Sequence, residues 1–116
     1  MDRNEFKEKL NKTSDIVDEK YCEDIIKNSL SAIPSSKNNI GTMNLLIVME
    51  ELAELSQEIS KYIRDSNNKI GILEEMADVY LGLKYIQKVI GISDEMMNKA
   101  INIKLERLHN KNLTNK

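Results

Sequence analysis

Two pairs of acidic residues have the spacing needed to hold a divalent cation. Glu51 and Glu54 lie in one apolar-rich stretch, and Glu75 and Asp78 lie in the next. Each pair is three residues apart, so on a helix its two carboxylates share one face, one turn apart. Carboxylate ligands without histidine or cysteine are typical of Mg²⁺ or Mn²⁺ sites rather than zinc sites. The pattern predicts a magnesium site built on two helices.

The charges around these pairs support this interpretation. Four acids and no lysine or arginine occur between Glu50 and Glu58, and three acids and no base occur from Glu74 up to Lys84. A solvated helix face usually alternates signs, because like charges one turn apart cost a few tenths of a kcal/mol each. A single pair with this spacing is most often ordinary surface charge. Two pairs on neighbouring helices without counter-charges favour a cation site.

The elements that must position these residues are helices. Apolar periodicity, capping residues and breakers predict four of them, with Thr13 or Ser14, Thr42 and Ser93 as the N-caps. Pro34 ends the first helix and Gly91 the third. The expected ranges are about 13–33, 42–65, 71–90 and 93–109, and the two acidic helices should form an antiparallel hairpin.

The sequence predicts an all-α fold, a four-helix bundle in one domain. Residues 1–12 form a polar N-terminal segment, residues 13–110 the helical domain, and residues 111–116 a polar tail. The acidic pairs flank the apolar stripes of their helices, which suits a cleft beside a core. Gly82 lies one turn beyond Asp78, where it either leaves room for a ligand or allows close helix packing.

Composition limits the function classes. The chain has 116 residues, 41% of them apolar and 31% charged, and its net charge of −2 does not favour binding to nucleic acid or to an anionic membrane. Cys22 is the only cysteine, so no internal disulfide can form. The longest apolar run has five residues, and the N-terminus has no hydrophobic signal segment. We therefore expect a cytoplasmic protein.

These residues also match a known family pattern. EELAEL (50–55) and EEMADVYLGL (74–83), with the spacer between them, resemble the EExxE…ExxD signature of MazG-like nucleotide pyrophosphohydrolases. NKAINIKLERL (98–108) resembles the last helix of that family, and the resemblance covers about residues 42–110. It implies the all-α NTP pyrophosphatase fold and Mg²⁺-dependent cleavage of an NTP or dNTP to the monophosphate and pyrophosphate. It also implies a homodimer or homotetramer whose subunits share sites.

The resemblance assigns roles to individual residues. Glu51, Glu54, Glu75 and Asp78 would be the metal ligands, and Glu50 a neighbouring acid of the signature. Glu50 or Glu54 is the candidate catalytic residue that positions the attacking water. The phosphate-binding cations would be Lys104, which falls within the apolar stripe of its helix, and Arg107 one turn on.

Two alternatives remain open. The chain could be a non-catalytic helical module that binds a nucleotide or metal, or a protein-interaction domain whose acids are surface charge. The first differs from the enzyme only in an assay of pyrophosphate release. The second predicts that Mg²⁺ does not raise the melting temperature, whereas a true site does so by mass action. A di-iron bundle is disfavoured because no ExxH motif is present.

Overall fold

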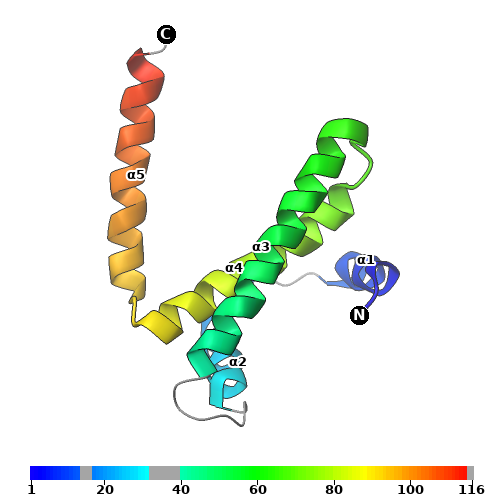
Figure 1. Cartoon of the computed structure of the whole chain (residues 1–116), viewed down its shortest axis with the longest axis horizontal. Coiled ribbons are helices and arrows are strands. Elements are labelled where there is room, and N and C mark those ends of the chain that lie inside the picture. The colour runs from blue at the N-terminus through cyan, green and yellow to red at the C-terminus, as the bar shows by residue number, and fades with distance from the viewer. Residues whose placement is uncertain (14–16, 32–39, 115–116) are drawn as a thin grey trace.

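The structure, a computed structural model, describes residues 1–13, 17–31 and 40–114, and the regular secondary structure in those ranges is all α-helix. This confirms the predicted all-α class. The described ranges contain five helices (Figure 1), which are α1 Arg3–Lys12, α2 Glu19–Ser31, α3 Ile40–Asp65, α4 Lys69–Ile90 and α5 Asp94–Thr114.

The long helices α3 and α4 form the predicted antiparallel hairpin and pack along each other (Figure 1). Only Ser66, Asn67 and Asn68 connect them. Ser66 has a φ of 61°, and its amide and hydroxyl both donate to the carbonyl of Tyr62. The chain reverses here because a polar residue accepts the left-handed conformation that ends α3.

Asn68 fixes the register of the hairpin. Its side-chain Nδ2 donates to the backbone carbonyl of Glu58 at 2.7 Å and to the Glu58 carboxylate, also at 2.7 Å. Asn68 stands at the N-cap position of α4, yet its side chain makes no capping hydrogen bond there. It instead joins the start of α4 to a residue two turns before the end of α3.

Gly82 is buried where the two helices approach each other. A Cβ built at this position would lie 3.2 Å from both Cγ atoms of Val48, closer than ordinary van der Waals contact. Val48 itself is only 3% exposed. Of the two interpretations of Gly82, the structure therefore supports close helix packing.

The two short helices both lie against α4 (Figure 1). Asp2 caps α1 by accepting from the amide of Glu5 at 2.8 Å, and the amide and hydroxyl of Thr13 donate to the carbonyl of Lys9 at its other end. The predicted N-cap at Thr13 is therefore wrong, because Thr13 closes α1. Residues 1–12, expected to be a polar segment, contain a complete helix.

The junction between α4 and α5 matches the prediction. Gly91 caps α4 with a φ of 87°, and its amide donates to the carbonyl of Gln87. The hydroxyl of Ser93 accepts from the amide of Met96 at 3.1 Å and so caps α5. Helix α5 continues to Thr114, past the predicted end near His109 and into the expected tail.

A four-helix bundle is not what the described residues form. Helix α5 projects away from the hairpin as a separate arm (Figure 1), and along it every residue from Asp94 to Leu113 except Met97 is exposed. The local pattern predicted an apolar stripe on this helix, but among the described helices none buries that stripe. Ser14 and Pro34, predicted to begin and end the first helix, lie outside the described residues. The predicted N-cap at Thr42 is wrong, because α3 begins at Ile40 and Thr42 lies inside it.

The chain exposes far more surface than a compact protein of its mass. Its accessible area is 9478 Å², whereas a monomeric globular protein of this size exposes about 6,500 Å². Ile26 and Val48 are the buried hydrophobic residues of the described part, and many large apolar side chains face solvent. Among the described helices, none is long and apolar enough to cross a membrane.

Candidate metal site

Three of the four predicted ligands meet between α3 and α4. One carboxylate oxygen from each of Glu51, Glu54 and Glu75 can be chosen so that all three lie within 4.8 Å of one another. Glu51 and Glu54 are one turn apart on α3, and Glu75 faces them from α4. The predicted spacing rule therefore places these three acids together, because the hairpin brings their two faces into contact.

Burial makes this cluster unlike a solvated acidic patch. Glu75 is 8% exposed, Glu51 is half-buried and Glu54 is exposed. Within the described residues, Oε2 of Glu51 and Oε2 of Glu75 are buried without a hydrogen-bond partner. A buried carboxylate oxygen without a partner is costly in water-free surroundings. A bound cation would satisfy both atoms.

The acids also raise one another's pKa values. Burial, followed by the contact with Glu54 and the charges of Asp78 and Glu51, raises the pKa of Glu75 to about 7. Burial and the charge of Asp78 also raise the pKa of Glu51. The site thus holds acids whose negative charges are mutually unfavourable, and a divalent cation relieves both the burial cost and the repulsion.

The fourth predicted ligand, Asp78, lies beside the cluster. It is half-buried and within hydrogen-bonding reach of Glu51, and burial is the main cause of its raised pKa. Glu50, the other candidate for water activation, is exposed and acts on Glu51 through its charge. The structure thus brings all four predicted ligands to one region and leaves Glu50 at its edge.

The donor set fits a hard divalent cation. Oxygens on opposite sides of an octahedral Mg²⁺ are separated by about 4.2 Å, and those on a larger Ca²⁺ by about 5 Å. Only one pair among three such oxygens can lie opposite each other, and neighbouring oxygens on Mg²⁺ lie about 3 Å apart. The oxygens of Glu51, Glu54 and Glu75, which lie within 4.8 Å of one another, would therefore approach by up to about 2 Å on binding. Glu54, being exposed, leaves the site open to solvent on one side.

The predicted phosphate-binding cations are not part of this cluster within one chain. Lys104 and Arg107 are exposed on α5, which extends away from α3 and α4 (Figure 1). Their assignment stays a prediction, and it requires α5 to reach the cluster of another copy.

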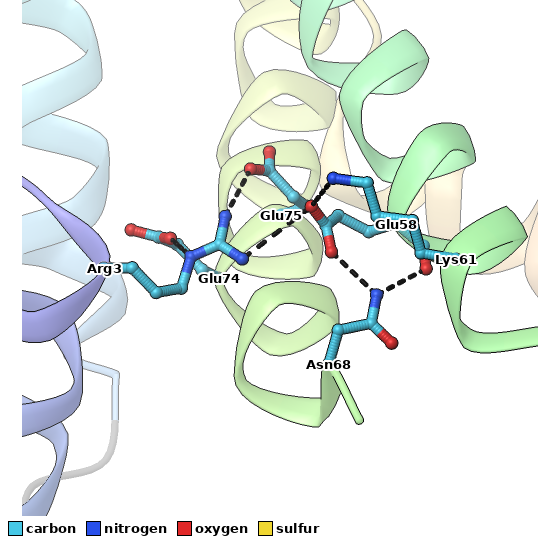
Figure 2. Close-up of polar contacts among 6 residues, drawn as sticks. All are labelled: Arg3, Glu58, Lys61, Asn68, Glu74 and Glu75. Carbon is cyan, nitrogen blue, oxygen red and sulfur yellow. Dashed lines mark hydrogen bonds and ion pairs between the residues drawn. The ribbon is translucent and has the colours of Figure 1, made fainter. Parts of the chain in front are cut away.

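A second group of charged residues adjoins the cluster and centres on Arg3, Glu58 and Glu74 (Figure 2). Arg3 of α1 places Nε 2.6 Å from Glu74 Oε1, Nη2 3.4 Å from Glu75 Oε1 and Nη1 3.8 Å from Glu58 Oε1. Glu58 is 9% exposed and is also contacted by Lys61 at 3.3 Å. The hydrogen bond from Asn68 is the main cause of the lowered pKa of Glu58.

The sequence carried a signal for one of these residues. Glu58 follows Glu51 and Glu54 at i+7 and i+4, so it continues the same face of α3. Nothing in the sequence indicated Arg3, because its partners are 55 to 72 positions away and the contact depends on how α1 docks.

Comparison with known proteins adds no assignment. No family model matches the chain, and neither a curated protein nor a solved structure matches it. The interpretation of the site therefore depends on its geometry and chemistry.

Proposed function

We propose that this protein is a Mg²⁺-dependent nucleoside triphosphate pyrophosphohydrolase that converts an NTP or dNTP to the monophosphate and pyrophosphate. The observation that carries the proposal is the convergence of Glu51, Glu54 and Glu75, from two helices, on one space, with buried oxygens of Glu51 and Glu75 lacking a partner. The resemblance of residues 50–55 and 74–83 to the MazG-like signature supports the choice of substrate class.

Glu51, Glu54, Glu75 and Asp78 would hold Mg²⁺, or Mn²⁺ in its place. When bound, the ion would neutralise the triphosphate oxygens and fix their orientation. The chain's own residues then have distinct tasks. Glu54 is exposed and can contact both the ion and solvent, so it or Glu50 would accept a proton from the water that attacks the α-phosphorus.

The same proposal includes self-assembly as a homodimer or homotetramer. The chain exposes about 3,000 Å² more than a compact monomer of its mass. Two chains together thus expose an excess of about 6,000 Å², which is enough for a large homodimer interface. Helix α5 presents Ile101, Leu105 and Leu108, each more than 40% exposed, on one face. Burying that face against another copy would also allow Lys104 and Arg107 to reach the partner's phosphates. Nucleotide substrates and the lone Cys22 both fit a cytoplasmic location.

The direct test is release of pyrophosphate from a panel of NTPs and dNTPs, with Mg²⁺, with Mn²⁺ and with EDTA. We expect metal-dependent turnover of at least one nucleotide and an increase in melting temperature on adding Mg²⁺. If Mg²⁺ stabilises the chain and no nucleotide is cleaved, the protein is instead a binding module. If neither effect occurs, the cation site is refuted.

Complementation tests whether sites are shared. Asp78→Ala should remove the cation site, and Lys104→Met should remove a phosphate contact given by the partner. Each variant should be nearly inactive alone. Unfolding and refolding them together should restore up to about a quarter of the activity, because about half of the dimers are mixed and each mixed dimer contains one intact site. A mixture that stays inactive would show that Lys104 acts within its own chain, and a fully active Lys104→Met variant would show that Lys104 has no role.

A further inference from the structure

Helix α1 touches the candidate metal site through one side chain. In the described part of the chain, the ion pairs that join α1 to α3 and α4 all come from Arg3, which bridges Glu58, Glu74 and Glu75 (Figure 2). Glu75 is a predicted metal ligand, whereas Glu58 and Glu74 are not. A guanidinium therefore already lies beside a ligand that the cation would use.

Little else holds α1 in place. None of its residues is buried, and Phe6 is its only half-buried one. The helix has ten residues, below the roughly 12–15 that an isolated helix needs to be even marginally stable in water. Its helical state thus depends on docking, and its docking depends largely on the charge of Arg3.

Gly71 leaves open the space that the Arg3 guanidinium occupies. A Cβ at Gly71 would overlap Nη1 of Arg3 and would lie 2.7 Å from Oε2 of Glu58. Gly71 is buried and precedes Glu75 by one turn on the same face of α4. The guanidinium therefore occupies a recess that exists because residue 71 has no side chain.

We infer that Arg3 holds α1 against α3 and α4, beside the candidate metal site, when no divalent cation is bound, and that cation binding weakens this docking. We call α1 in this role the strap. This inference deepens the proposed function, since it rests on the cation site and names its regulation. A divalent cation on the unpartnered Oε2 of Glu75 repels the guanidinium that contacts Oε1 of the same carboxylate, and it neutralises the negative charge that holds Arg3 there. Coupling of this kind is reciprocal, so docking of α1 must weaken cation binding by the same factor.

The test measures cation binding without nucleotide. Mn²⁺ is titrated into the full chain, and free Mn²⁺ is followed by electron paramagnetic resonance. Arg3→Met keeps the length of the side chain and removes its charge, and we expect it to raise Mn²⁺ affinity about five-fold or more. Lys9→Met is the matched control, because it removes one positive charge from α1 on a different face, and it should leave the affinity nearly unchanged.

Gly71→Ala supplies a variant that changes no charge. The added methyl group displaces the guanidinium, so this variant should also raise Mn²⁺ affinity, by less than Arg3→Met. Hydrogen exchange of the α1 amides reports docking directly. Exchange should accelerate when Mn²⁺ is added to the wild type and should already be fast in both variants.

The outcomes separate this inference from the proposed function. Unchanged or lower Mn²⁺ affinity in Arg3→Met, or α1 exchange that does not respond to Mn²⁺, would overturn the strap even if the wild type hydrolyses nucleotides. Higher affinity in both variants would support the strap even if no nucleotide is cleaved. A wild type that binds no Mn²⁺ would overturn both proposals.

Discussion

Helices α4 and α5 are nearly equal in length, with 22 and 21 residues, yet their surroundings differ. Helix α4 is covered by α3 along one face and contacted by α1 and α2. Its buried positions are Gly71, Glu75 and Gly82, two residues without side chains and one acid. Helix α5 also carries an apolar stripe, but that stripe faces solvent. Apolar positions of α4 are used for contacts within the chain, whereas those of α5 are mostly left exposed, which is why we propose that another copy covers them.

This difference assigns the two halves of the proposed site to different sources. On the proposed function, the metal ligands come from a hairpin that one chain completes alone, with only three residues in its turn. The proposed phosphate-binding cations, Lys104 and Arg107, lie on an arm that extends away from that hairpin in its own chain (Figure 1). We therefore expect the hairpin to bind a cation before assembly and turnover to require assembly.

Removing a ligand from the hairpin should have the largest effect. Glu54→Ala and Asp78→Ala should each reduce Mg²⁺-dependent pyrophosphate release by about 100-fold or more, because each removes charge that holds the ion. Circular dichroism should still show a helical protein. Glu106→Ala, an exposed acid on α5, is the control and should retain activity. Wild-type turnover by either ligand variant at saturating Mg²⁺ would refute the assignment.

Introducing negative charges into the apolar stripe of α5 should disrupt self-association. Leu105→Asp with Leu108→Asp should weaken self-association by about 30-fold or more, since the loss of even one buried anchor costs about 2 kcal/mol. Size-exclusion chromatography with light scattering reports the oligomer. Ile103→Asp is the matched control, since Ile103 is 59% exposed on the opposite face of α5. Equal effects of both changes would show that the stripe is not the contact surface.

The pH dependence of stability isolates Glu75. Its pKa is about 7 in the folded chain against an ordinary 4.5, so the folded state holds this proton more tightly than the unfolded state. Stability from this group is therefore complete below pH 4.5 and is lost as pH rises through 7. Glu75→Gln removes that loss, so at pH 8 without metal it should be more stable than the wild type by up to about 3 kcal/mol. Urea unfolding at pH 4.5 and pH 8 measures the difference, which should be absent at pH 4.5.

Packing inside the hairpin gives the smallest expected change. Gly82→Ala adds a methyl group 3.2 Å from both Cγ atoms of Val48. Overpacking costs about 1–3 kcal/mol and the gain in helix propensity returns about 1 kcal/mol, so we expect a net loss of about 1 kcal/mol. Adding Val48→Ala to this variant should restore part of the lost stability, because it removes the two Cγ atoms that the new methyl group contacts. A stabilised Gly82→Ala variant would show that the contact relaxes freely.

Local chemistry explains which features the sequence could predict. Gly91 and Ser93 were recognised as caps because a cap depends on a few neighbouring residues. The acidic hairpin was predictable for the same reason, since spacing within each helix and a short turn decide it. The Arg3 contact and the exposed stripe of α5 depend on docking between distant segments. An apolar pattern shows that a face must be covered and does not identify what covers it.

The short connection after α4 has a wider consequence. The left-handed Gly91 sets the angle at which α5 leaves, and Gln87 reinforces it by donating to the carbonyl of Ile92 at 3.3 Å and to Asp94 at 2.9 Å. If two copies exchange their arms reciprocally, the assembly has two-fold symmetry and stops growing, whereas a different exit angle would send each arm to a new neighbour and produce an open filament. On the proposed assembly, the conformation of Gly91 would thus help to decide whether the chains form a finite particle or a polymer.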